Sequence, residues 1–532
     1  MTVRRTLLCA SILLTVFWVQ RLTAQSQQGA FRVPTIRVTS RLVFLDVTVL
    51  DKKGRPVVTG LTRDDFTITE DKKPQRIFSF EAPEAHAMGA NVAEDNPDEK
   101  APVTIFVLDL LNSSFEDFVF IRYSVQKYLE AQPPQLNSPA EMMVIGNESL
   151  EMVQGYTRNQ EDLLYALNHL SPALPYKMMN GSFWAERLVQ SIDALQQIAL
   201  QNKGVPGRKN IVWVGHGGPS ITTQRFNGLP VLDELKQYVH ATTNMLVDSR
   251  ITLYVIYPGL PVQGSHIPIS GLDADVDLGN DDPFAGDINF GVFVNETGGK
   301  LFYNRNDVDA EIGRSEQLGS EYYTLTYQPH GGDENGKFRR IRVTLRNPNL
   351  RVVTKAGYFA PDKMAPFDPR QQTTVNAVEA AQSTIPFNAL DMKISSIVRH
   401  PDTRTAEVTM LLKGKNLDWQ ATDRGKSTAK LTLLAVSLTG NKDILASKSE
   451  TVTLSQATDN PARLAEYVTS LKFAIQVPRK TQSIRVVMET EEGGRIGAAD
   501  LDRKAIDAAP ESPTKEPQLL PGRQDQETPP AP

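Results

Sequence analysis

An acidic residue and a run of small polar residues follow the most apolar short stretch of this sequence. Residues 103–108 read VTIFVL, which predicts a strand buried on both faces. Asp109 comes directly after this strand, and Asn112, Ser113 and Ser114 form the next turn. Open α/β sheets place their ligand sites at the carboxyl ends of their strands, beside helix N-termini. We therefore expect Asp109 to lie in a binding crevice.

The histidines, serines and cysteine of the sequence do not form a recognisable catalytic motif. His216 follows another apolar strand pattern, 210–214, but a lone histidine at a strand end is more often structural than functional. The sequence has no G-x-S-x-G elbow and no phosphate-binding glycine loop. Its one cysteine, Cys9, lies in the N-terminal apolar run, so a mature chain would have no thiol for catalysis or metal binding. We therefore predict that the protein is not an enzyme.

Strands and helices alternate around Asp109 between residues 102 and 320. Apolar strand patterns and apolar helical periodicity take turns at 103–108, 115–131, 142–146, 210–214, 229–248 and 251–257. Alternation of this kind indicates an α/β fold with a doubly wound, mostly parallel sheet and helices on both faces. Such a sheet would position Asp109 and His216 at its carboxyl edge.

The segments that flank this sheet have the two-residue period of β structure. Residues 35–81 and 321–360 each hold too few strands to bury a core alone. We therefore expect one discontinuous β-domain with the α/β domain, 102–320, inserted between its strands; the alternative is two independent small sheets. Residues 388–500 predict a C-terminal β-sandwich preceded by a linker. Residues 505–532 are rich in Pro, Glu and Gln and predict a disordered tail.

Residues 1–24 have the features of a signal peptide. Arg4 and Arg5 form a basic start, residues 7–19 are apolar but short for a membrane span, and Ala24 suits signal peptidase. Cleavage there would give an exported protein, periplasmic or extracellular, without a stable membrane span; the alternative is a retained anchor. The net charge of −5, with acidic and basic residues interspersed, argues against a nucleic-acid surface.

Four separated stretches carry a resemblance to a known family. They read VTVLDKKGRPVVTGLTRDDFTITED, PVTIFVLDLLNSSFEDF, ETGGKLFYNRNDVDAEI, and YYTLTYQPHGGDENGKFRRIRVTL with a following KAGYFAP. In this order they resemble the VWFA-related domain family of secreted bacterial proteins, of the type first defined in Acidobacteria, which is related to the von Willebrand factor A (VWA) domain. The resemblance covers residues 35–361 and leaves out the C-terminal sandwich. It implies a VWA-like α/β sheet that binds a protein ligand.

The resemblance also implies a metal-ion-dependent adhesion site. In VWA domains a DxSxS motif, a threonine and a later aspartate hold Mg²⁺ or Mn²⁺ through hard oxygen ligands, with one position left for a carboxylate of the partner. Asp109 matches the first acid and Ser113 the second serine. Leu111 stands where the first serine should be, and His216 or Gly217 where the later aspartate should be. The motif is therefore degenerate.

Two residues could supply the threonine oxygen, Thr157 or Ser182, and the resemblance does not choose between them. His216 could replace an oxygen ligand with an imidazole, which would shift the preference toward Mn²⁺ or Zn²⁺. The structural alternative is that Asp109 caps its turn through backbone amides. If Asp109 is instead a ligand, Asp109→Ala should weaken binding without unfolding the protein.

These observations lead to a secreted, non-enzymatic binding protein of the adhesion type. Its VWA-like domain would bind a protein partner, with or without a divalent cation. One alternative is an envelope scaffold or assembly factor with a vestigial metal site. Another is an enzyme of a class that the sequence does not identify.

Overall fold

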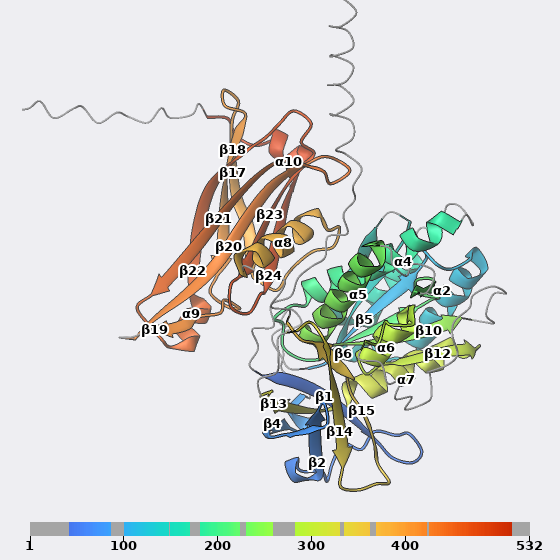
Figure 1. Cartoon of the computed structure of the whole chain (residues 1–532). Helices are drawn as coiled ribbons and strands as arrows, with labels where there is room; N and C mark the ends of the chain where they lie inside the picture. The colour runs from blue at the N-terminus through green and yellow to red at the C-terminus, as the bar shows by residue number, and fades with distance from the viewer. Residues whose placement is uncertain are drawn as a thin grey trace, which may run out of the picture.

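The computed structural model describes residues 42–86, 101–147, 149–170, 181–223, 230–258, 282–329, 335–361, 369–422 and 425–512. They form a mixed α/β structure with several sheets (Figure 1). No helix in these residues is both long enough and apolar enough to cross a membrane. The predicted signal peptide lies outside the described residues.

Six strands form the sheet of the α/β domain. In sheet order they are β12 (Lys300–Arg305), β10 (Ile251–Pro258), β8 (Lys209–Val214), β5 (Val103–Asp109), β6 (Gln135–Ile145) and β7 (Leu150–Asn159). Five of them run parallel, and β7 runs antiparallel at one edge. The central strands β5 and β8 consist mostly of apolar and β-branched residues and are buried along their length, as expected for strands covered on both faces.

Helices cover both faces of this sheet (Figure 1). On one face lie α4 (Gly181–Gln201), α5 (Pro230–Asp248) and α6 (Phe290–Glu296); on the other lie α2 (Phe115–Glu130), α3 (Gln160–Asn168) and α7 (Val308–Ser320). The neighbouring β5 residues Phe106 and Val107 show the division, because their side chains are buried in the two opposite layers. The predicted mixed α/β fold with a largely parallel sheet is confirmed.

Strands from before and after the α/β domain combine in a second unit. One sheet has the order β15 (Arg351–Val353), β1 (Val43–Leu50), β13 (Tyr323–Tyr327), β4 (Ile77–Glu81), and the other has the order β16 (Gly357–Phe359), β14 (Phe338–Leu345), β2 (Phe66–Glu70), β3 (Lys73–Gln75). Strand β1 pairs with β13 and β15, and β14 pairs with β2. Leu45, Ile68 and Leu325 are fully buried in the core that the two sheets share. We call this unit, within residues 42–86 and 321–361, the split β-domain.

Two further sheets form the C-terminal unit. One contains β17 (Met392–His400), β18 (Thr405–Lys413) and β22 (Val468–Gln476), and the other contains β19 (Gln420–Thr422), β20 (Lys426–Leu438), β23 (Ser483–Thr490) and β24 (Ile496–Asp502), with β21 (Ile444–Gln456) also paired to β20. A short helix, α9 (Pro461–Glu466), precedes β22. Val408, Leu433 and Val486 are buried in one core that joins the two sheets.

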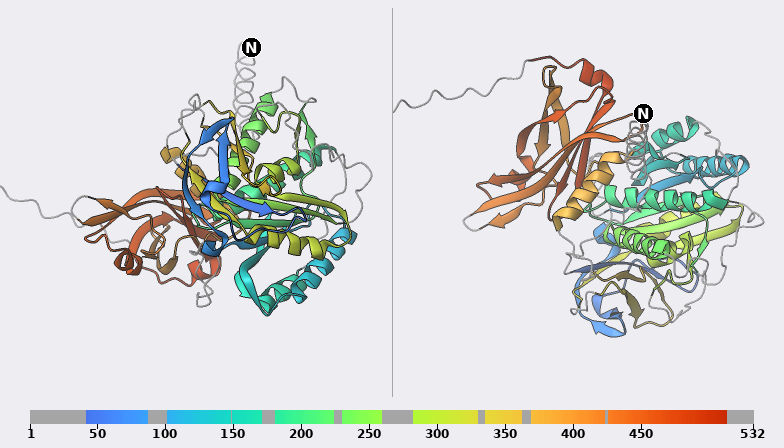
Figure 2. Two further views of the ribbon diagram at one scale, coloured as in Figure 1. Left: turned by 90° about the horizontal axis from the view of Figure 1, so that it is seen from below. Right: turned by 45° about the horizontal axis from the view of Figure 1, so that its top comes forward.

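The expected linker before this unit contains a helix, α8 (Pro369–Gln382). Ala377, Ala380 and Ala381 are fully buried at helical spacing. Figure 2 shows α8 between the C-terminal sheets and α4. The segment is therefore part of the structure and not a free connection.

The predicted disordered tail begins too early. Helix α10 (Arg503–Asp507) follows β24, and its Ile506 is 1% exposed. Glu511 forms an ion pair with Arg399 at 2.6 Å, and the backbones of these two residues also form a bridge. Residues 505–512 thus close the C-terminal unit, and residues 513–532 lie outside the described residues.

Polar contacts fix the C-terminal unit to the α/β domain. Lys203 Nζ lies 2.9 Å from Glu489 Oε1, and the Glu489 side chain is 2% exposed. Ser383, which follows α8, donates its hydroxyl proton to Gln197 Oε1 of α4 at 2.6 Å. Buried side chains of both units also share one continuous apolar layer, so the two units pack against each other.

Candidate functional site

Asp109 lies at the carboxyl end of β5 and has no solvent exposure. Its Oδ1 accepts from the Asn112 backbone N–H at 2.9 Å, and its Oδ2 accepts from Trp213 Nε1 at 3.0 Å and the Gly217 N–H at 2.8 Å. The Asn112 side-chain amide lies 3.1 Å from both oxygens. Oδ1 therefore already has two donors from the protein and Oδ2 has three, which is about the full capacity of a carboxylate.

A glycine lets the end of β8 close over this carboxylate. Gly215 has a φ of 145°, and a Cβ at this position would lie 2.3 Å from the Asp109 Cβ. The close approach places the Gly217 N–H and the Trp213 indole against Asp109. Any other residue at position 215 would push the two strand ends apart.

The Asn112 side chain links Asp109 to helix α4. Its Nδ2 donates to Ser191 Oγ at 3.0 Å, and its Oδ1 accepts from Arg187 Nε at 3.1 Å. Ser191 Oγ in turn donates to the Arg187 carbonyl at 2.8 Å. Burial lowers the pKa of Arg187, and the nearby Asp109 charge opposes that effect. A half-buried guanidinium therefore lies next to the predicted site.

The structure brings Ser113 close to Asp109 without a bond between them. The Ser113 hydroxyl is buried and has no hydrogen-bond partner among the described residues. The Ser113 hydroxyl and the Asp109 side chain both lie against Gly215. Leu111, which takes the place of the first motif serine, is buried in the apolar layer under α4. The DxSxS-like turn therefore presents one hydroxyl and one saturated carboxylate.

His216 contacts α2 and not Asp109. Its Nε2 lies 3.3 Å from Asp117 Oδ2, and its ring meets the edge of Tyr257 at a centroid distance of 5.3 Å. Asp117 also closes the capping box at the start of α2 with Ser114. The His216 hydrogen bond, together with those from Ser114, holds the pKa of Asp117 below its usual value against the effect of burial. His216 thus ties the end of β8 to the first turn of α2.

Thr157 lies far from this edge of the sheet. It pairs with Ala140, whereas Asp109 pairs with Ile145 at the other end of β6. Five residues along a strand separate the two levels by about 16 Å. The Thr157 hydroxyl donates to Asp162 at 2.9 Å. The side chain of Ser182, the other candidate, lies outside the described residues.

These residues do not fit a divalent cation. Mg²⁺ and Mn²⁺ need several oxygen ligands with free lone pairs, but Asp109 is saturated and His216 and Thr157 point to other partners. The described part of the chain contains no group of three or more His, Cys, Asp or Glu side chains arranged for a metal. The guanidinium of Arg187 would also repel a cation there. The expected metal set of Asp109, Ser113 and His216 is thus corrected to a hydrogen-bonded hub with an arginine beside it.

Comparisons with known proteins find similarity among solved structures but no match to a family model or a curated protein. Among solved structures the chain is similar to the crystal structure of the SpRpn10 VWA domain, with 17% sequence identity and a TM-score of 0.17. That alignment covers 30% of this chain and 90% of the SpRpn10 chain.

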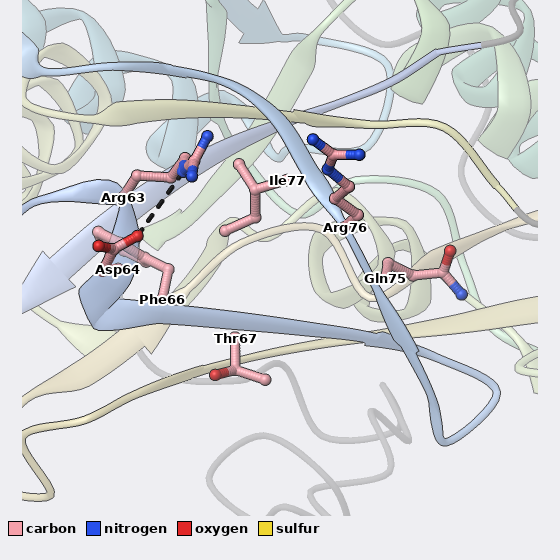
Figure 3. Close-up of a pocket in the computed structure, with 7 residues that line it drawn as sticks. All are labelled: Arg63, Asp64, Phe66, Thr67, Gln75, Arg76 and Ile77. Atoms are coloured by element: carbon pink, nitrogen blue, oxygen red, sulfur yellow. Dashed lines mark ion pairs between the residues drawn. The ribbon is translucent and has the colours of Figure 1, made fainter.

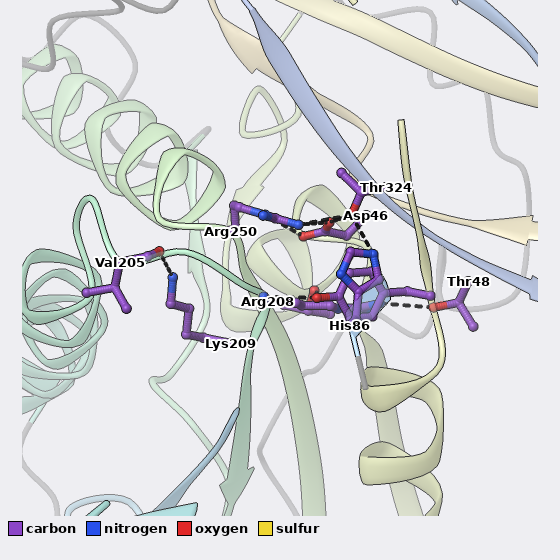
Figure 4. Close-up of polar contacts among 10 residues, drawn as sticks. Asp46, Thr48, His86, Val205, Arg208, Lys209, Arg250 and Thr324 are labelled. Carbon is purple, nitrogen blue, oxygen red and sulfur yellow. Dashed lines mark hydrogen bonds and ion pairs between the residues drawn. The ribbon is translucent and has the colours of Figure 1, made fainter. Parts of the chain in front are cut away.

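A second buried polar cluster lies between the α/β domain and the split β-domain (Figure 4). Arg208 is 2% exposed and donates to the hydroxyls of Thr48, Thr252 and Tyr254 at 3.0, 3.0 and 3.1 Å. Thr48 donates its own proton to the Leu318 carbonyl at 2.9 Å. Arg208 therefore joins β1 of the split β-domain to β10 of the central sheet.

Arg250 completes this junction with an ion pair. Its guanidinium contacts both oxygens of Asp46, at 2.5 and 3.1 Å, and Thr324 Oγ1 at 3.1 Å. Burial opposes ionisation of Asp46, but Arg250 and Arg208 hold its pKa below the usual value. His86 stacks on the nearby Tyr322 ring with centroids 4.3 Å apart. No local pattern of residues predicted this junction, because its members come from segments up to 278 residues apart.

Proposed function

We propose that this chain is an exported, non-enzymatic binding protein. Its α/β domain would recognise an acidic group of a protein partner at the carboxyl edge of its sheet, with Arg187 in the role that a metal ion has in adhesion-type sites. The resemblance of residues 35–361 to the VWFA-related family supports the protein-binding class. Residues 1–24 support export to the periplasm or the extracellular space.

The Arg187 guanidinium is the observation that carries the proposal. Its Nε is used by Asn112, whereas its two Nη groups have no hydrogen-bond partner in the part of the chain that the structure describes. Arginine keeps its charge in a protein, and its planar fork can bind a carboxylate through two parallel hydrogen bonds. Asn112 accepts from Arg187 Nε and is itself held by Asp109 and Ser191, so little conformational entropy would be lost on binding.

The test asks whether binding of the partner depends on the Arg187 charge or on a metal ion. A partner would be identified by cross-linking in the native exported fraction, purified, and titrated by calorimetry against the mature chain. We expect binding to persist in EDTA and to weaken about 10- to 100-fold in Arg187→Gln, as expected for loss of a hydrogen-bonded charge pair. Arg122→Gln on α2 is the control. Loss of binding in EDTA with no effect of Arg187→Gln would reject the proposal in favour of a cation site.

The envelope scaffold is a second candidate, and the docking of the C-terminal unit favours it. Buried side chains of α8, β20 and β23 share one apolar layer with α4. A rigid three-part body of this kind suits a protein that holds partners at fixed spacing. Under this alternative Arg187→Gln would leave partner binding unchanged, whereas deletion of the C-terminal unit would abolish it.

A further inference from the structure

An open groove lies between β2 and β4 at one side of the split β-domain (Figure 3). Its volume is about 320 Å³. Its walls include Arg63, Asp64, Phe66, Thr67, Arg76 and Ile77. In Figure 3 the side chains of Arg63 and Arg76 point to the same side, with Ile77 between them. The groove is therefore lined mostly by polar and charged side chains, with two cationic groups on either side of Ile77.

The two sheets of the split β-domain have four edge strands, and three of them are protected against pairing with another chain. The edge strand β15 has only three residues. The backbone of Phe359 in β16 is bonded through both N–H and C=O to the side chain of Asn244 in α5, at 2.8 and 2.9 Å. Strand β3 contains Lys73 and Pro74, both of which discourage strand addition.

The fourth edge, β4, has five residues and carries an exposed phenylalanine. Within the described strands, β4 pairs with β13 on one side only. The pairing skips Phe78, since Ser79 is opposite Thr326 and Ile77 is opposite Tyr327. Such a bulge redirects its side chain, and Phe78 is 69% exposed. A bulge can protect an edge, but this one presents an aromatic ring to solvent where a protective charge would be expected.

Four basic side chains lie in the groove or in the turn beside it. Arg63 has one acidic neighbour, Asp64, at 3.7 Å, and both side chains are more than half exposed. Arg76 forms no ion pair within the described residues, and Lys72 and Lys73 are exposed in the adjacent turn, where Asp71 is paired with Arg339. Since the whole chain has a net charge of −5, this basic area departs from the average surface. An acidic partner would be favoured here over a neutral or basic one.

We propose that β4 and its groove bind an extended acidic segment of a partner protein as an added strand. The segment would pair with the edge of β4 that no described strand covers, place carboxylates against Arg63 and Arg76, and pack an apolar side chain on Phe78. This surface belongs to the split β-domain and is separate from the Arg187 site. It gives the protein a second binding site, with backbone pairing for affinity and the two arginines for selectivity.

The test uses a fluorescein-labelled peptide of alternating Glu and Val, eight residues long, and the mature chain with Arg187→Gln already in place. That background removes any contribution of the α/β site. We expect fluorescence anisotropy to show saturable binding that weakens about tenfold or more in Arg76→Glu and by a smaller factor in Phe78→Ser. The matched control is Arg351→Glu, an exposed arginine on β15 at the opposite edge of the same sheet. A peptide of alternating Lys and Val should not bind.

Each other outcome would overturn the proposal. Binding that is equal in Arg76→Glu and in the control would place the peptide elsewhere. Binding in the wild type that disappears with Arg187→Gln alone would assign it to the α/β site and support only the proposed function. A dimer in sedimentation equilibrium that Phe78→Glu dissociates would mean that β4 pairs with a second copy. A neutral Arg76→Gln variant that binds the peptide as tightly as the control would likewise overturn the role of the Arg76 charge.

Discussion

Two buried carboxylates of this protein are stabilised in different ways. Asp109 is held by neutral donors, namely an indole, a side-chain amide and backbone N–H groups. Asp46 is held by the guanidinium of Arg250, with Arg208 nearby. At the junction Arg208 and Arg250 are both occupied by partners, whereas Arg187 beside Asp109 keeps donors free among the described residues. We infer that the junction contributes to stability, whereas Arg187 at the sheet edge has donors available for a ligand.

The largest effect is expected at the junction. Arg250→Ala would leave Asp46 buried without its partner, and we expect the free energy of unfolding to fall by about 3–5 kcal/mol. Chemical denaturation of the mature chain measures the change. Arg55→Ala is the control, because Arg55 pairs with Asp51 on the surface and its side chain is 65% exposed. A loss at Arg250 no larger than at Arg55 would mean that the junction contributes little to stability.

Glu141 is a third buried carboxyl, and it has weaker support than Asp109 or Asp46. It has no solvent exposure, and the Tyr156 hydroxyl is the polar group that faces it. Burial raises its pKa from 4.5 to about 8. The folded state therefore keeps a proton that the unfolded state loses over this range, so stability falls as the pH rises.

We expect Glu141→Gln to remove this pH dependence. Relative to the variant, the wild type should lose about 1 kcal/mol of unfolding free energy per pH unit between pH 5 and 8. Urea denaturation at several pH values measures the difference, and Glu116→Gln on the exposed face of α2 is the control. Parallel pH profiles for wild type and Glu141→Gln would show that the carboxyl is ionised and solvated in the folded state.

Asp109→Ala is expected to destabilise the protein by about 2–4 kcal/mol, because it leaves the Trp213 indole and the Gly217 N–H buried without an acceptor. This reverses the expectation from sequence, which was weaker binding in an intact fold. Denaturation with and without Mg²⁺ or Mn²⁺ distinguishes a structural role of Asp109 from a role as a metal ligand. Asp64→Ala, at an exposed position, is the control. A wild type that either cation stabilises, and a variant that unfolds normally but loses this effect, would restore Asp109 as a ligand.

The sequence was informative where structure depends on local periodicity. The run before Asp109 predicted β5, and its continuous apolar character predicted burial on both faces. Alternating strand and helix patterns indicated the largely parallel sheet. The shortage of strands in each flanking segment led to the idea of one split β-domain, and β1 does pair with β13 and β15. The first two predictions needed only neighbouring residues, whereas the third came from counting the strands that each segment could supply.

The sequence was not informative where a contact joins distant segments. Arg187 lies 75 residues from Asn112, and its side chain differs in no visible way from that of a surface arginine. Leu111 and His216 showed that the metal motif was degenerate, but not that Asp109 would be saturated by Trp213. The sequence predicts a linker where helix α8 lies, although the alanines at positions 377, 380 and 381 have the spacing of a buried face. The many small and polar residues of α8 hide the helical periodicity of these alanines.

The smallest effect is expected at His216, where the hub meets α2. The His216 and Asp117 side chains are 16% and 25% exposed and 3.3 Å apart, so His216→Ala should cost no more than about 1 kcal/mol. Because the pKa of folded Asp117 is below 3.8, this contribution is present above about that pH and is lost as the pH falls through the folded value. Denaturation midpoints between pH 2.5 and about 7 should therefore converge for wild type and variant at the acid end. If His216 were a metal ligand, Mn²⁺ or Zn²⁺ would raise the midpoint of the wild type and not of the variant, a result that the Asp117 contact does not produce.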